Sequence, residues 1–408
     1  MDRIYRRMCG LSPIQEGQKE AKLLELYLHI PFCARKCSYC DFLSFSVNAR
    51  EHAPYIGKLC QELSLFSKAA SDYEISSVFI GGGTPSVLDP HFIEALLQTI
   101  REHYHLRDDA EITIEVNPAS TLRYKFASYL RSGINRLSIG LQSANNEELH
   151  RLGRIHIFED FLKCYQGARL EGFQNISIDL MKNIPGQTPA SWRKSLKNVI
   201  MLKPEHLSLY DLIVEEGTPF YELDRKGELE LPDEDMEEEI DEIAKELTEK
   251  HGYSRYEISN YARPGYFCRH NYGYWSNIPY LGFGLGASSC FEGSRWHNLR
   301  DLSDYLTLDL QKDAEAGCPK LREEYKKLSR RDEINEFLFL GLRRTAGVSE
   351  IDFVSRFSVD LFSIFGPSLK RFLRQGLLVK ENARFYFTER GMMISNMLLS
   401  QLLLEENI

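Results

Sequence analysis

The sequence predicts an α/β fold with a parallel sheet, followed by a smaller helical domain. Between Leu23 and Tyr210, short apolar stretches alternate with stretches of helical spacing, and strand–helix–strand repeats of this kind form βαβ units. Each predicted strand runs into glycine or polar residues, which is where β/α barrels place their chemistry. After about residue 306 the pattern changes to helices with one hairpin.

Six strands and five helices are expected in the first half of the chain. The apolar, β-branched stretches predict strands at 23–30, 76–80, 111–116, 135–139, 175–180 and 206–210. The helical patterns lie at 51–69, 91–103, 119–132, 158–171 and 190–202. Six βα units are too few for a closed eight-stranded barrel.

Four regions are expected along the chain. Residues 1–22 form a poorly ordered N-terminal extension without the apolar segment of a secretory signal. Residues 23–230 form the partial barrel, 231–305 complete its core, and 306–408 form a winged-helix-like domain. Within the second region, 233–250 has helical apolar spacing and a strongly acidic outer face, and we expect that face to be solvated.

Composition and charge exclude several classes of protein. The net charge of −9 over 408 residues disfavours nucleic-acid binding, which needs a basic face. No apolar segment approaches the roughly 18 residues that span a membrane. Nine cysteines without a secretory signal indicate a reducing compartment and metal chemistry. We therefore expect a cytoplasmic protein.

Three cysteines follow the first predicted strand. Pro31 ends that strand, and Cys33, Cys37 and Cys40 follow with C-x3-C-x2-C spacing. Three thiolates this close can converge on one soft metal centre. A closed zinc site and an ordinary iron–sulfur cluster each take four ligands, so three cysteines on a 4Fe–4S cluster leave one iron open. The alternatives are a zinc site completed by a distant Cys or His, and thiols that bind nothing.

This spacing, with Tyr39 just before the third cysteine, resembles the signature of the radical S-adenosylmethionine (SAM) superfamily. The resemblance implies an incomplete (β/α)6 TIM-like barrel and a 4Fe–4S cluster on the three cysteines. It further implies that SAM binds the open iron. An electron donor then reduces the cluster, and a C–S bond of SAM splits to give a 5′-deoxyadenosyl radical.

The strand ends resemble the oxygen-independent coproporphyrinogen-III oxidase family over nearly the whole chain. An acidic side chain can accept from ribose hydroxyls, and an arginine presents a planar fork to a carboxylate. The resemblance implies that SAM is bound by residues on the strands and on the loops that follow them: Tyr27, Gly82, Gly83, Thr84, Glu115, Gln142, Arg154, Asp179 and Ile213.

A later motif points to one branch of this family. His270-Asn271-x-x-Tyr274-Trp275 is similar to the motif of the haem-chaperone branch, and an imidazole can be an axial haem ligand. The resemblance therefore implies haem as a further cofactor with His270 as its candidate ligand. The alternative is a histidine that is hydrogen-bonded inside an aromatic cluster.

Two departures separate the chain from the oxidase branch. The oxidase has Cys-Gly-Cys at the end of its cysteine motif, whereas this chain reads Cys40-Asp41-Phe42. The oxidase also carries a longer segment before the first strand. We therefore predict a haem chaperone that binds haem and passes it to an acceptor protein. The alternative is an oxidase that decarboxylates two propionates of coproporphyrinogen III to give protoporphyrinogen IX.

Overall fold

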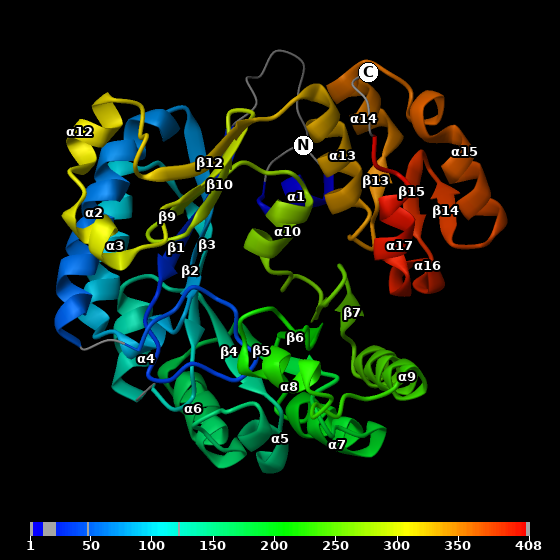
Figure 1. Ribbon diagram of the computed structural model, residues 1–408, viewed down its shortest axis with the longest axis horizontal. Helices are drawn as coiled ribbons and strands as arrows, with labels where there is room; N and C mark the ends of the chain where they lie inside the picture. Colours follow the sequence, from blue (N-terminus) through cyan, green and yellow to red (C-terminus); the bar gives the residue numbers. More distant parts are fainter. Residues whose placement is uncertain (1–2, 11–21, 47–48, 121–122, 405–408) are drawn as a thin grey trace.

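One twisted sheet of twelve strands organises the large domain of the computed structural model, which describes residues 3–10, 22–46, 49–120 and 123–404 (Figure 1). The strand order is β12-β11-β10-β9-β1-β2-β3-β4-β5-β6-β8-β7. The strands are β1 (Lys22–Ile30), β2 (Tyr73–Gly82), β3 (Leu106–Val116), β4 (Arg136–Gln142), β5 (Ile176–Lys182), β6 (His206–Asp211), β7 (Ser254–Arg255), β8 (Asn260–Ala262), β9 (Tyr280–Phe283), β10 (Ser288–Phe291), β11 (Ser294–Asn298) and β12 (Arg322–Lys327).

Strands β1 to β6 pair in parallel in chain order, which confirms the predicted α/β partial barrel. Strands β1 and β6 are not neighbours in the sheet, so the barrel stays open. Strand β9 adds a further parallel strand beside β1, which the sequence analysis did not predict. The crossover helices are α2 (His52–Phe66), α3 (Pro90–His103), α4 (Arg123–Arg131), α6 (Phe158–Glu171) and α7 (Pro189–Ile200).

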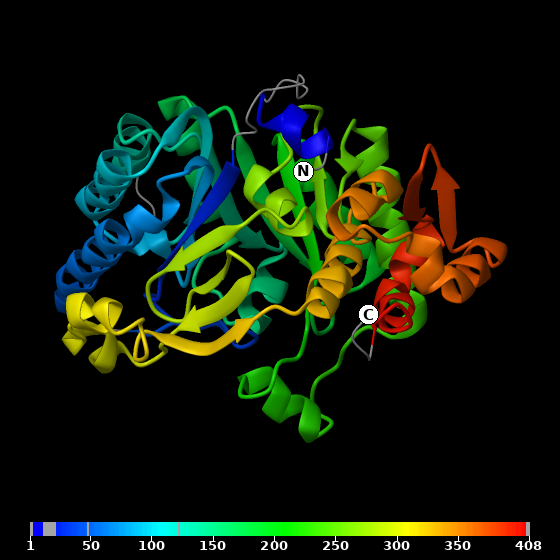
Figure 2. The ribbon, with the colours of Figure 1, turned by 90° about the horizontal axis from the view of Figure 1, so that it is seen from above.

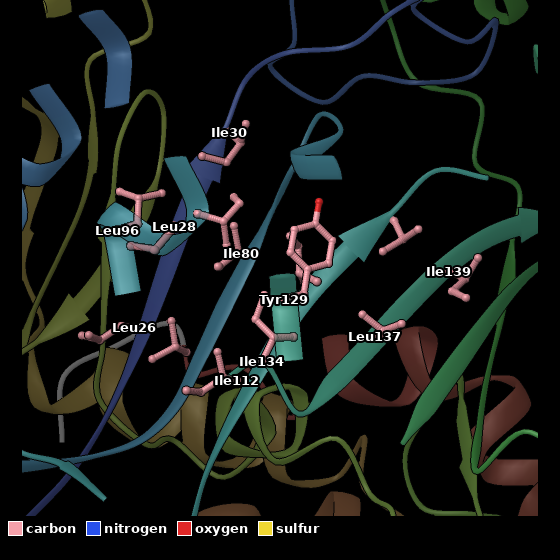
Figure 3. Packing of buried hydrophobic residues seen from close by; sticks show 14 of the residues in the cluster. Leu26, Leu28, Ile30, Ile80, Leu96, Ile112, Tyr129, Ile134, Leu137 and Ile139 are labelled. Atoms are coloured by element: carbon pink, nitrogen blue, oxygen red, sulfur yellow. The ribbon is translucent and has the colours of Figure 1, made fainter. Parts of the chain in front are cut away.

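The strands alternate between an apolar outer face and a more polar inner face. On β1, Leu26, Leu28 and Ile30 are fully buried in the main hydrophobic cluster, and Leu96 of α3 belongs to the same cluster (Figure 3). Successive side chains of a strand point to opposite faces. The same alternation turns a second set of residues toward the barrel interior: Glu25, His29, Glu115, Asp179 and Tyr210.

Side-chain caps fix where several helices begin. At the start of α3, the Asp89 side chain accepts from the backbone N–H of His91 at 3.2 Å. Pro90 is the first residue of this helix. Thr188 caps α7 in the same way through the N–H of Ser191 at 3.2 Å. Each cap satisfies a donor that has no partner inside the helix.

The N-terminal segment differs in part from the prediction. Helix α1 (Arg3–Met8) packs against α10 (Arg269–Trp275) instead of being poorly ordered (Figure 1). The cause is Tyr5, which is fully buried and donates from its hydroxyl to Glu25 at 2.5 Å. Residues 11–21 of the predicted extension lie outside the described residues.

Most helices of the segment that follows the six strands pack on the crossover helices of the barrel. Helix α9 (Glu234–Lys250) packs on α7, where Trp192 Nε1 donates to the Ile240 carbonyl at 3.1 Å. Helix α8 (Pro219–Arg225) lies on an arm that projects from the body (Figure 2). Helices α11 (Leu302–Thr307) and α12 (Leu310–Glu315) pack against α2. Because Leu310 and Leu321 belong to the barrel's hydrophobic cluster and β12 pairs with β11, residues 306–327 pack with the barrel.

The C-terminal domain has its own hydrophobic cluster, which begins at Ile334. Its three-stranded sheet has the order β13-β15-β14, and the predicted helices and hairpin are present. Its elements are α13 (Arg330–Gly341), β13 (Val348–Ser349), α14 (Glu350–Phe357), α15 (Leu361–Arg374), β14 (Leu378–Glu381), β15 (Arg384–Phe387), α16 (Glu389–Met393) and α17 (Ser395–Ser400). Within the described chain, we find no helix with the length and apolarity needed to cross a bilayer.

Candidate active site at the carboxyl ends of the strands

A cavity of about 380 Å³ opens where the carboxyl ends of β1 to β6 meet. Cavities of this size hold small molecules. The structure brings eleven of the predicted site residues to its wall: Cys33, Cys37, Cys40, Gly82, Gly83, Thr84, Glu115, Gln142, Arg154, Asp179 and Ile213. Two other predicted residues, Tyr27 and His270, are not among the lining residues.

The cysteine loop leaves β1 and is tied back to the barrel by backbone hydrogen bonds. The N–H of Cys33 donates to the Phe45 carbonyl at 3.0 Å, and the N–H of Thr84 donates to the Phe32 carbonyl at 2.8 Å. The Thr84 hydroxyl lies 3.3 Å from Cys33 Sγ. Burial raises the pKa of the Cys40 thiol to about 11. A positive metal centre at this loop would oppose that effect, because metal-bound thiols are deprotonated.

Gly83 is required by the close packing between the glycine loop and the cysteine loop. A Cβ atom at this position would lie 2.9 Å from the Phe32 carbonyl oxygen and 3.0 Å from Cys33 Sγ. Only a residue without a side chain fits there. The backbone of the glycine loop therefore forms part of the cavity wall beside the cysteines.

Arg154 places a guanidinium between the cysteine loop and the cavity. One terminal nitrogen lies 3.6 Å from Cys37 Sγ, and the other donates to the Gly140 carbonyl at 2.8 Å. Its Nε is buried and has no hydrogen-bond partner within the described structure. Because a buried donor without a partner is costly, this nitrogen is suited to an acceptor on a bound ligand.

Two carboxyl groups face the cavity from neighbouring parts of the sheet. Glu115 accepts from the Gly82 N–H at 3.1 Å, and Asp179 accepts from the Ser138 and Ser177 hydroxyls, each at 2.9 Å. Burial and the charge of Asp179 raise the pKa of Glu115 to about 8. Burial also raises the pKa of Asp179. This pair suits a ligand that brings positive charge or hydroxyl donors.

Gln142 reaches the cavity through an irregularity in β4. The register between β4 and β5 shifts between Gly140 and Gln142, and Gln142 has a φ of 74°. Non-glycine residues with such a backbone often occur at functional sites. The Tyr210 hydroxyl donates to the Gln142 side-chain oxygen. Tyr210 and Ser138 also line the cavity and were missed, although both lie on inward-facing positions of strands that were predicted.

Tyr27 and His270 lie deeper in the barrel. The Tyr27 hydroxyl is 3.1 Å from His29 Nδ1. His270 is 1% exposed, and its two ring nitrogens lie 2.8 Å from the Ser77 and Tyr274 hydroxyls. Burial lowers the pKa of His270 to about 3. The surroundings match the alternative named above, a hydrogen-bonded histidine in an aromatic cluster.

The donor set fits an iron–sulfur cluster better than a single ion. Three thiols line one cavity, and its lining residues in the described chain include no other cysteine and no histidine. No three His, Cys, Asp or Glu side chains of the described residues are grouped closely enough to hold one ion. In a cluster, each thiolate binds a different iron, so the sulfur atoms need not meet at one point.

Two family models and a solved structure match this chain. Residues 27–199 match the radical SAM superfamily, and 328–394 match the HemN C-terminal domain. The solved structure of coproporphyrinogen III oxidase (HemN) from Escherichia coli is 23% identical, with a TM-score of 0.80 over 99% of this chain and 93% of that one. The fold and the site therefore define a radical SAM protein.

Curated relatives identify the branch. The haem chaperone HemW of Bacillus subtilis is 36% identical over 91% of this chain and 96% of its own length. HemW of Escherichia coli is 33% identical over 94% and 98% of the two chains. A mitochondrial radical SAM domain-containing protein 1 of Mus musculus is 33% identical over 97% and 91%. The chain belongs to the HemW family.

Proposed function

We propose that this protein is a haem chaperone of the cytoplasm, which binds haem and passes it to an acceptor protein. The observation that carries the proposal is the similarity to curated haem chaperones over almost the whole of both chains. Cys40-Asp41-Phe42 supports it, because the additional cysteine that follows the third one in the oxidase motif is absent.

The proposal assigns the cavity to a 4Fe–4S cluster and SAM. Cys33, Cys37 and Cys40 would hold the cluster, which supplies one-electron chemistry when bound. Arg154, whose buried Nε has no hydrogen-bond partner in the described structure, would donate to the carboxylate of SAM. The hydroxyl donors and positive charge of SAM suit the Glu115–Asp179 pair, and an electron donor would reduce the cluster.

The haem ligand is a separate part of the proposal. His270 remains a prediction, and it requires that a ring nitrogen leave the hydroxyl of Ser77 or Tyr274. That change would also have to bring His270 to a surface, because the side chain is buried.

A haem titration tests the proposal. The anaerobically reconstituted protein is titrated with haem while the Soret band is recorded, and the same preparation is assayed for protoporphyrinogen formation. We expect saturable, stoichiometric haem binding without turnover of coproporphyrinogen III. Robust turnover, with release of 5′-deoxyadenosine, would replace the chaperone with the oxidase.

A further inference from the structure

The mouth of the cavity carries two large apolar side chains that are mostly exposed. Phe42 follows the third cysteine and is 60% exposed, and Ile213 lies after β6 and is 66% exposed. Both border the same cavity although they come from distant parts of the chain. Single exposed apolar residues are ordinary, whereas two that border one cavity mouth suit a ligand surface.

Two cationic residues also lie at the mouth of the cavity, which we call the rim. Arg35 and Lys36 lie between the first and second cysteines, are exposed, and border the cavity. Within the described residues, neither side chain forms an ion pair or a hydrogen bond, although the Lys36 charge acts on the Cys40 thiol and lowers its pKa against the larger effect of burial. Both charges are therefore available to an anionic ligand.

We propose that this rim is the haem-binding surface, with Arg35 and Lys36 on the two propionates and Phe42 and Ile213 against the macrocycle. The inference rests on the proposed function and specifies where the haem lies: away from His270, which does not line the cavity, and against Ile213, which the resemblance assigned to SAM. Haem combines a flat apolar ring with two carboxylates on one edge, so an apolar patch beside two cations matches it. Arginine binds carboxylates with a planar fork, and an aromatic ring stacks on flat apolar surfaces.

The other charges on the rim set the orientation of the haem. Asp41 and Glu215 are exposed and also border the cavity, as does Asp211, whose carboxylate is already paired with Lys182 at 3.0 Å. Their carboxylates repel propionates and direct the anionic edge of the haem toward Arg35 and Lys36. The interior of the cavity is assigned to the cluster and SAM, so the haem lies over its mouth.

The test compares haem with its dimethyl ester, which keeps the macrocycle but has no carboxylates. The reconstituted wild-type protein and an Arg35→Ala/Lys36→Ala variant are titrated with both. We expect the variant to bind haem roughly tenfold more weakly than wild type, from two exposed ion pairs of ordinary strength. The ester should bind both proteins with this same weaker affinity.

Matched variants show whether a loss of haem affinity comes from the missing charge or apolar contact, or from damage to the cysteine loop. Arg35→Lys/Lys36→Arg keeps both charges and should restore haem binding. Lys68→Ala/Lys194→Ala removes two exposed lysines away from the cavity and should leave haem binding unchanged. Phe42→Ala should weaken haem and ester alike, whereas Leu170→Ala, which removes a side chain 70% exposed elsewhere, should weaken neither. Iron content and SAM affinity should be unchanged in every variant.

The outcomes distinguish this inference from the function on which it rests. If wild type binds haem and the Arg35→Ala/Lys36→Ala variant binds it as tightly, the rim is not the propionate site, while the chaperone stands. The same holds if the ester binds wild type as tightly as haem does. If wild type binds no haem at all, the proposed function fails first.

Discussion

Replacing Glu115 with glutamine should stabilise the cofactor-free protein, and increasingly so as the pH rises. The pKa of Glu115 lies at about 8 in the folded protein, against an ordinary value of 4.5, because of burial and the charge of Asp179. Below 4.5 both the folded and the unfolded protein hold this proton. Between 4.5 and about 8 only the folded protein holds it, so unfolding releases a proton and stability falls as the pH rises.

The size of the change in the free energy of unfolding follows from the pH range between 4.5 and about 8. Each pH unit within it costs the folded state about 1.4 kcal/mol, which gives roughly 4 kcal/mol between pH 5 and pH 8. Glu115 borders the cavity and is only partly buried, so water reduces the effect, and we expect about 2 kcal/mol. Glutamine cannot ionise, and its side-chain oxygen can still accept from the Gly82 N–H.

The assay is urea unfolding of the cofactor-free protein at pH 5 and pH 8, followed by circular dichroism. Glu115→Gln should match wild type at pH 5 and exceed its free energy of unfolding by about 2 kcal/mol at pH 8. Glu238→Gln, an exposed position on α9, controls for the change in net charge. Equal stability differences for Glu115→Gln at the two pH values would refute the reasoning.

Three further predictions concern the walls of the cavity. Cys37→Ser leaves two cluster ligands and should abolish iron retention on anaerobic reconstitution; an unchanged iron content and visible spectrum would contradict this. Gly83→Ala should cost about 1 to 3 kcal/mol of stability through overpacking against Phe32 and Cys33, read from urea unfolding; wild-type stability would count against the contact. Tyr210→Phe removes the donor to Gln142 and should weaken SAM binding severalfold in equilibrium dialysis, for a loss of about 1 kcal/mol; unchanged affinity would remove Tyr210 from the site.

The sequence predicted those elements whose structure depends on the pattern of neighbouring residues. Strands β1 to β6 could be predicted because apolar residues alternate along them and polar residues follow their ends. Strand β9 could not, because Tyr280–Phe283 is short and glycine-containing, and its pairing with β1 joins residues more than two hundred positions apart. Local patterns do not encode such a contact.

The same limit applies to single side chains. Tyr5 is held by Glu25 in a different element, so the segment before β1 looked unstructured on its own. His270 has the residue type of a haem ligand, but its hydroxyl partner Ser77 comes from a distant strand. By contrast, Glu115 and Asp179 could be placed correctly, because the ends of parallel strands meet at one edge.

The open barrel has a consequence for which part of the molecule opens first. Strands β1 and β6 share no ladder, yet the loops that follow them meet, where the Phe220 N–H donates to the Ser38 carbonyl at 3.0 Å. Parting this seam breaks few backbone hydrogen bonds, whereas parting β1 from β2 breaks a nine-residue ladder. Amide exchange should therefore be fast at Phe220 and slow at Leu28. We therefore expect the seam to open more readily than the central strands, which stay intact.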